Sequence, residues 1–184
     1  MNKVTRSEVL AVSDYLGIRD RFRQSVIEQK KDRRIHLGEH LTFLFETHDT
    51  ILYQIQEMMR AEAIAGEPEI EHEIATYNEL LGDRGELGAT LLIEIDDREK
   101  RDELLRRWRG LPEALYIGTS DGGRVAAVFD PRQVGKDRIS SVHYLKFPVG
   151  DRVVERLGTT HPELSLEVTL TPRQRAVLMA DLTA

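Results

Sequence analysis

The sequence contains no cysteine. Disulfide bonds, thiolate metal sites, iron–sulfur ligation by this chain and a cysteine nucleophile are therefore excluded. The sequence also lacks any run near the roughly 20 apolar residues that span a bilayer. Its first eight residues lack the apolar stretch of a signal peptide. These absences predict a soluble cytoplasmic protein that does not associate with membranes.

The common catalytic and nucleotide-binding motifs are absent as well. The chain has no phosphate-binding P-loop, no dinucleotide-binding glycine pattern, no nucleophile elbow, no zinc-protease helix and no calcium loop. We therefore expect no nucleotide cofactor, and a bound metal ion stays an open alternative.

Acidic residues outnumber basic ones, 32 to 26, which gives a formal net charge of −6. This balance argues against nucleic acid as a partner, because phosphate binding depends on Lys and Arg displacing counterions. The charge is unevenly placed: residues 19–34 hold seven Lys and Arg, whereas residues 55–79 hold seven glutamates and one arginine. We expect these two segments to face each other or to face solvent.

Length and composition indicate one folded domain. The 184 residues are 40% hydrophobic and 32% charged, which is enough apolar material for a core and too little charge imbalance for disorder. The sequence thus predicts a single domain over residues 1–184 and leaves open a subdivision near residues 82–88.

Periodicity and capping residues predict helices and strands in groups. Helices are expected over residues 13–32, 47–65, 68–81, 96–108 and from 172 onward, and Ile27 is expected on the inner side of the first of these. A capping-box pattern at Thr5 and Glu8 predicts a short helix before them. Strands are expected over residues 34–37, 41–45, 89–95, 114–119, 124–129, 139–147 and 164–170, with 148–162 as an extended excursion. The grouping predicts an α+β fold: a mixed, mainly antiparallel sheet with helices packed on it, a helical N-terminal half and a sheet-rich C-terminal half.

The helix expected over residues 47–65 carries a polar stripe. Gln54, Glu57 and Arg60 follow one another at three-residue spacing, and Tyr53 lies beside Glu57. This stripe is a candidate ligand-binding face. The alternative is a solvated side on which Arg60 pairs with Glu57 and Gln56.

His143 lies within the β-prone run of residues 140–147. Alternation places it on the same face as Leu145 and Phe147, with Tyr144 on the opposite face. A buried strand histidine needs a hydrogen-bond partner, and it either has a structural role or acts as a base or ligand. We include Glu46 and Glu62 with it as further candidate ligand-binding residues.

One pair of residues has the spacing of a metal motif. Glu69 and His72 stand three residues apart, as in carboxylate-bridged di-iron bundles. Such a site needs a second motif of this kind and two further glutamates on a four-helix bundle. The alternative is an exposed acidic helix start.

Several segments together resemble a known family. They are Lys30-Lys31 with Arg33-Arg34, the run from Leu37 to Glu46, the run from Tyr53 to Glu62, Tyr77-Asn78, and Ser141 to Leu145 with Phe147. The chain resembles, over nearly its whole length, an uncharacterised bacterial family classed as a domain of unknown function. The chain departs from the family pattern at Glu79, where the family favours proline.

The resemblance implies a cellular setting. Genes of this family often neighbour those of rubrerythrin-like proteins and iron–sulfur oxidoreductases. A rubrerythrin-like or iron–sulfur protein is therefore an expected partner.

The main hypothesis is an accessory protein that binds a ligand, a metal or a partner within an oxidative-stress or iron redox system. One alternative is an enzyme of unknown reaction with Glu57 or His143 as acid or base. Another is a structural interaction module, able to form an oligomer through the helix of residues 48–65.

Overall fold

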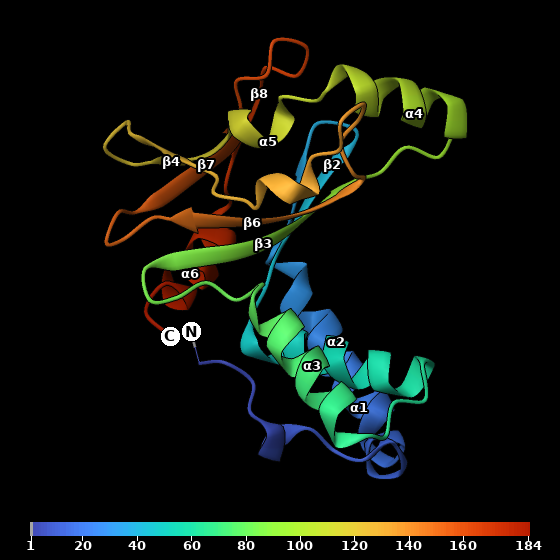
Figure 1. Ribbon diagram of the computed structural model, residues 1–184. Coiled ribbons are helices and arrows are strands. Elements are labelled where there is room, and N and C mark those ends of the chain that lie inside the picture. The colour runs from blue at the N-terminus through green and yellow to red at the C-terminus, as the bar shows by residue number, and fades with distance from the viewer. Residues whose placement is uncertain (1) are drawn as a thin grey trace.

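The structure, a computed structural model, describes residues 2–184 and has α+β architecture (Figure 1). After a short 3₁₀ turn at Arg6–Glu8, the helices are α1 (Val12–Lys31), α2 (His48–Ala61), α3 (Glu67–Asn78), α4 (Arg98–Arg107), α5 (Leu111–Ala114) and α6 (Pro172–Asp181). The strands are β1 (Arg34–Leu37), β2 (Leu41–Phe45), β3 (Glu86–Ile93), β4 (Leu115–Thr119), β5 (Arg124–Ala126), β6 (Val142–Pro148), β7 (Val154–Thr159) and β8 (Leu166–Thr169). The helices lie mostly in the N-terminal half and more of the strands in the C-terminal half, which confirms the predicted fold class.

The strands form two antiparallel sheets of four strands each. Their orders are β1-β2-β3-β6 and β5-β4-β7-β8. The sheets join beyond β5, where Val128 and Lys146 exchange backbone hydrogen bonds of 2.7 and 2.8 Å. The sheet is thus divided in two, but the predicted antiparallel pairing is confirmed.

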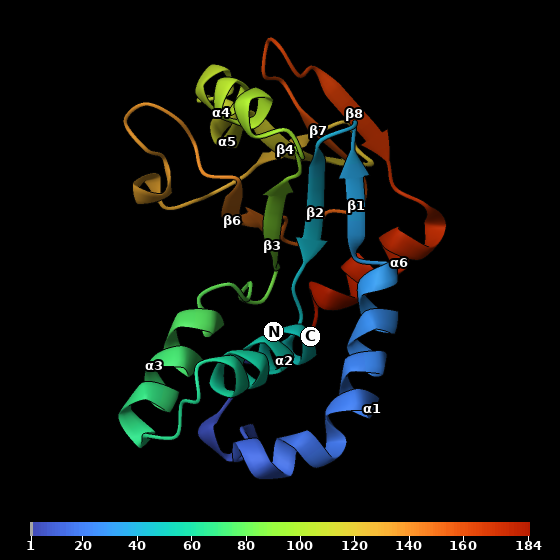
Figure 2. The ribbon, with the colours of Figure 1, turned by 90° about the vertical axis from the view of Figure 1, so that its right-hand side faces the viewer.

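The apolar side chains form two cores. The larger core lies between the sheets and includes Phe43, Leu91 and Leu157. The smaller core lies among the helices and includes Ile55 of α2 and Ile74 of α3. Figures 1 and 2 show α1, α2 and α3 grouped at one end of the sheets, with α4 and α5 at the other end. None of the helices within residues 2–184 combines the length and apolar character that crossing a membrane requires.

Three local expectations were wrong. Helix α2 ends at Ala61 because Ala63 adopts a left-handed conformation (φ 54°), and the Ile64 N–H then bonds back to the Met59 carbonyl oxygen at 2.9 Å. The segment expected as an extended excursion contains β7. Ile27, expected on the inner side of the first long helix, is 40% exposed.

Two side-chain amides fix the N-terminal segment against the helices. The Gln56 side chain accepts the Leu10 N–H at 2.7 Å and donates to the Leu10 carbonyl at 3.2 Å. Asn78 makes the same two bonds to Val4, both at 2.8 Å. Each amide thus acts as a strand partner for one residue and satisfies its backbone polar groups.

Replacing Gln56 with leucine is expected to lower the free energy of unfolding by about 1–2 kcal/mol, because it leaves the Leu10 N–H and carbonyl without partners. Urea denaturation measures this loss, and limited proteolysis is expected to cut the first ten residues faster. Gln24→Leu on the exposed face of α1 is the control. Equal stability of the two variants would contradict the role of Gln56.

An ion pair connects two residues that lie far apart in the sequence. Arg33, just before β1, donates to both Asp181 oxygens of α6, at 2.7 and 2.9 Å. The two side chains are 14% and 10% exposed. The burial and the two parallel hydrogen bonds make this a geometrically specific contact.

Candidate functional site

The pairing register of the first sheet places neighbouring residues on opposite faces. Leu44, Thr90 and Tyr144 lie side by side across β2, β3 and β6. His143 pairs instead with Leu91, which belongs to the core between the sheets. Because strand side chains alternate, the row that contains Tyr144 faces away from this core. It faces a cavity shared with the helices.

We call this cavity the Glu46 pocket. Its volume is about 220 Å³. It is lined from the sheet by Leu44, Glu46, Thr90, Leu92 and Tyr144, and from the helical side by Lys30, Thr50, Ile51, Gln54, Tyr77 and Leu80. Polar groups thus converge from both sides on one small cavity, as in ligand sites.

Glu46 is the central acidic group of the pocket. It follows β2 directly and is 7% exposed. The Thr50 hydroxyl donates to one carboxylate oxygen at 2.6 Å, and the Thr90 hydroxyl donates to the other at 2.7 Å. Its backbone N–H donates to the Gly88 carbonyl at 2.9 Å. The carboxylate is therefore held in one orientation, and each oxygen keeps a lone pair for a further donor.

Lys30 supplies a positive charge at the end of α1. Its ammonium lies 5.8 Å from the centre of the Tyr53 ring. Phe22 holds that ring edge-on at 5.8 Å between centroids. Burial lowers the pKa of Lys30, and the nearby Glu46 carboxylate partly opposes this effect. Among the contacts within residues 2–184, Lys30 and Glu46 make no ion pair, although both line the cavity.

Neutral polar groups complete the lining. Burial raises the pKa of the Tyr77 phenol of α3, and the nearby Gln54 side chain of α2 partly opposes this effect. Tyr144 is 43% exposed. The pocket therefore offers an amide and two phenols beside its two charges.

Glu57 lies in a different contact, between α1 and α2. It accepts hydrogen bonds from Tyr15 at 2.6 Å, from Arg19 at 2.7 and 2.9 Å, and from Arg60 at 3.1 Å. The Arg19 guanidinium is the main group that lowers the pKa of Glu57, to about 2. Glu57 is thus an ionised structural carboxylate at neutral pH. The expected pairing of residues 19–34 with residues 55–79 is seen here.

The geometry of a helix separates the members of the polar stripe. Positions three residues apart differ by about 60° around the axis, so Arg60 lies about 120° from Gln54. Gln54 consequently reaches the pocket, Glu57 reaches α1, and Arg60 is exposed.

His143 is fully buried, at 0% exposure. Its Nε2–H donates to the Ser140 carbonyl at 2.9 Å, and its Nδ1 has no hydrogen-bond partner among the described residues. Burial lowers the pKa of His143, which keeps the imidazole neutral at pH 7. Neither His143 nor Glu57 lines the Glu46 pocket.

The structure thus brings together two of the candidate residues, Glu46 and Gln54. Tyr53 contacts the pocket through Lys30, whereas Glu62 is exposed after α2. The sequence reasoning missed Lys30 and Tyr144 as site residues. Both lie in segments that carry the family resemblance, and strand alternation already placed Tyr144 opposite His143.

The Glu69–His72 pair on α3 has no second motif of its kind beside it among the described residues. Glu69 and His72 are both exposed. Within residues 2–184, no three His, Asp or Glu side chains gather in a way that would hold a metal ion.

Comparisons with known proteins give a family and a neighbouring structure. Residues 3–182 match the model of a family described as "Protein of unknown function (DUF3501)". A crystal structure of a novel protein of unknown function from Burkholderia pseudomallei is similar, with a TM-score of 0.90 and 30% identity. The alignment covers 98% of this chain and 100% of that one. No curated protein matches the chain.

Proposed function

We propose that the chain, which belongs to the DUF3501 family of proteins of unknown function, binds a small polar organic molecule in the Glu46 pocket. The observation that carries this proposal is Glu46 itself. Its carboxylate is nearly buried, is fixed by Thr50 and Thr90, and lines a cavity. Burying a charged group is costly unless partners or a ligand compensate for its lost hydration.

The charges of the pocket favour a zwitterion. Glu46 accepts hydrogen bonds and attracts a cationic group, whereas Lys30 attracts an anionic group. Because the two side chains share a cavity without pairing, a ligand with an ammonium at one end and a carboxylate at the other matches both. Gln54 and Tyr77 supply further polar contacts between the poles.

The size of the cavity limits the ligand. A volume of about 220 Å³ lies below the roughly 300–1,000 Å³ of typical ligand pockets. A short amino acid or amino-acid-like compound fits this space. A nucleotide is too large for it.

The segments of the family resemblance supply the lining. All five contribute at least one polar residue, from places far apart in the sequence: Lys30, Glu46, Gln54, Tyr77 and Tyr144. This convergence supports the pocket as the shared feature of those segments.

We extend the proposal to an accessory role in an oxidative-stress or iron redox system, with a rubrerythrin-like or iron–sulfur protein as partner. Its support is the family resemblance. Because the described residues hold no grouped metal ligands, the proposal places any redox metal in the partner. A direct affinity measurement between this chain and a purified rubrerythrin-like protein tests this role.

Binding of short zwitterions tests the proposed ligand class. We expect at least one of glycine, β-alanine and 4-aminobutyrate to bind in calorimetry. At about 100 times its Kd, such a ligand raises the free energy of unfolding by about 2.7 kcal/mol. Butylamine and butyrate, each with one of the two charges, are expected to bind more weakly.

Glu46→Gln is expected to weaken zwitterion binding by about tenfold or more, because it removes a charged hydrogen-bond acceptor and keeps the shape of the side chain. Glu62→Gln, on the exposed end of α2, is the matched control and should bind as the unmodified protein does. The proposal fails if no zwitterion binds at millimolar concentration, or if the two variants bind equally.

A further inference from the structure

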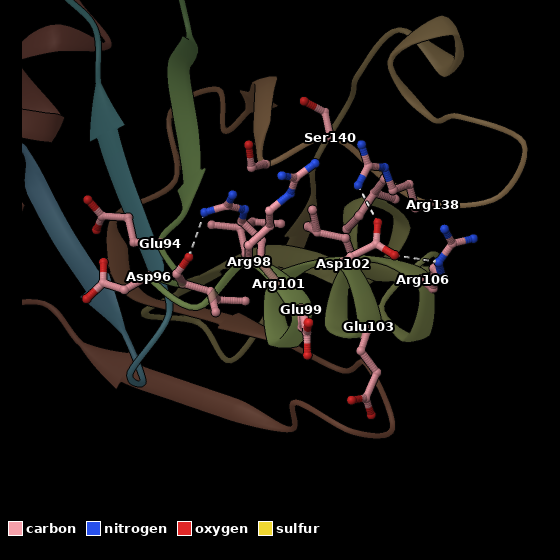
Figure 3. A pocket seen from close by; sticks show the side chains of 15 residues that line it. Glu94, Asp96, Arg98, Glu99, Arg101, Asp102, Glu103, Arg106, Arg138 and Ser140 are labelled. Carbon is pink, nitrogen blue, oxygen red and sulfur yellow. Dashed lines mark hydrogen bonds and ion pairs between the residues drawn. The ribbon is translucent and has the colours of Figure 1, made fainter.

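A second hollow lies at the opposite end of the sheets. It is a groove of about 1280 Å³ between α4, the end of β3 and residues 138–141 (Figure 3). We call it the arginine groove, because Arg98, Arg101, Arg106 and Arg138 line it. Its lining residues do not overlap with those of the Glu46 pocket.

The arginines gather around one space. In Figure 3 the Arg98 side chain extends from α4 toward Ser140, the Arg101 side chain turns toward the end of β3, and Arg138 lies on the neighbouring wall. Arg101 is held in place by donating to the Ile95 carbonyl at 2.9 Å. Within residues 2–184 the Arg98 side chain has no hydrogen bond or ion pair. A guanidinium is thus available in the groove.

The acidic residues of the groove do not pair with the Arg98 guanidinium. Asp102 lies between Arg106, at 3.0 Å, and Arg138, so its charge is already matched. Glu94 accepts from the Thr42 hydroxyl at 2.5 Å, outside the groove.

The remaining carboxylates do not reach the arginines either. Those of Asp96, Glu99 and Glu103 point away from the space between Arg98 and Ser140 in Figure 3. The groove as a whole is lined by five carboxylates and four guanidiniums, but the Arg98 guanidinium beside Ser140 has no carboxylate partner among residues 2–184.

A hydroxyl group adds a neutral donor. Ser140 Oγ accepts the Val142 N–H at 3.1 Å, which leaves its own hydrogen free to donate. Ser140 is exposed and lies at the rim of the same space.

We propose that the arginine groove binds a small molecule with at least two negative charges on phosphate or carboxylate oxygens, through Arg98, Arg138 and the Ser140 hydroxyl. A guanidinium presents a planar fork of N–H donors that matches the paired oxygens of a phosphate or a carboxylate. The groove is open and its volume of about 1280 Å³ leaves room for the rest of a ligand beside its anionic groups. The proposal is independent of the Glu46 pocket.

Titration of the ¹⁵N-labelled protein in about 0.15 M salt tests the proposal, with inorganic pyrophosphate and succinate as separate probes. We expect one probe to bind with a Kd below about 1 mM. The resonances of the Arg98 and Arg138 side chains and of the Ser140 amide are expected to shift. Tighter binding of pyrophosphate identifies a phosphate ligand, and tighter binding of succinate identifies a dicarboxylate.

Variants separate a specific site from diffuse charge. Arg98→Gln is expected to weaken binding by about tenfold or more, and because Arg98 is exposed, the variant should fold normally. Arg109→Gln, at an exposed arginine just beyond α4, and Glu46→Gln are expected to bind as the unmodified protein does. Absence of binding for both probes at about 10 mM overturns the proposal. So does equal weakening by Arg98→Gln and Arg109→Gln.

Discussion

Gly88→Ala is expected to abolish cooperative unfolding or to lower the free energy of unfolding by at least about 4 kcal/mol. A Cβ at position 88 would lie 2.0 Å from the Leu80 carbonyl oxygen and 2.9 Å from the Gly82 backbone nitrogen. Both contacts are with backbone atoms, so no side chain can rotate away. Urea denaturation followed by circular dichroism measures the loss.

Gly88 also holds part of the Glu46 pocket in place. The Gly88 carbonyl accepts the Glu46 N–H, and Leu80 lines the pocket, so a shift of either strand or turn displaces the site. We therefore expect that any Gly88→Ala protein that does fold has lost its affinity for zwitterions.

Gly17→Ala is the matched control. An added Cβ at Gly17 meets nothing within 4 Å, and the residue lies inside α1. Alanine is the better helix former by about 0.5–1 kcal/mol, so this variant should be more stable than the unmodified protein. A Gly88→Ala protein of normal stability would mean that residues 80–82 do not pack on β3.

Glu57→Gln is expected to lower the free energy of unfolding by about 2–3 kcal/mol at neutral pH. Glu57 is 18% exposed and accepts hydrogen bonds from three side chains, two of them arginines. Removing its charge leaves Arg19 without its main partner between α1 and α2. Thermal or urea denaturation at pH 7 measures the effect.

The same carboxylate predicts a pH dependence. Its pKa falls from an ordinary 4.5 to about 2 in the folded protein. A lowered pKa contributes stability that is fully present above the unfolded value and is lost as the pH falls through the folded value. The contribution of Glu57 is therefore complete above about pH 5 and disappears between about pH 4.5 and pH 2.

Comparing two variants isolates this contribution. The difference in stability between the unmodified protein and Glu57→Gln should shrink as the pH is lowered from 5 to 2. Glu28→Gln, which removes an exposed pair with Lys31, should cost less than about 0.5 kcal/mol at any pH. A Glu57→Gln cost that stays constant down to pH 2 would contradict the ion pair as its cause.

Much of the fold could be predicted because its signals are local. Helix α6 begins at Pro172 as expected, and the strands expected over residues 34–37 and 41–45 pair with each other as β1 and β2. Strand β7 was missed because Gly158 weakens its β pattern. A Cβ at Gly158 would lie 2.6 Å from the Tyr116 hydroxyl oxygen and 2.9 Å from the Leu166 carbonyl oxygen. The glycine that resembles a loop signal is thus needed for close packing within the sheet.

The candidate site could be predicted only in part because it depends on pairing between distant strands. Gln54 and Glu46 were identified from a helical stripe and from the neighbourhood of a hairpin. Thr90 and Tyr144 enter the pocket through the register that places them opposite each other on β3 and β6. The spacing of residues within one segment does not reveal how that segment pairs with a distant strand. Conversely, Glu57 belongs to the polar stripe that predicts ligand binding, but its carboxylate pairs with Arg19 of the same chain and not with a ligand.

The ion pair between Arg33 and Asp181 has a consequence for synthesis on the ribosome. The two residues are 148 positions apart, and at about 5–20 residues per second Asp181 is made roughly 7–30 s after Arg33. During that interval Arg33 is without its buried counter-charge. The nascent chain therefore keeps an unpaired guanidinium at the start of β1 until the last helix emerges, and this interval is when a chaperone has most to protect.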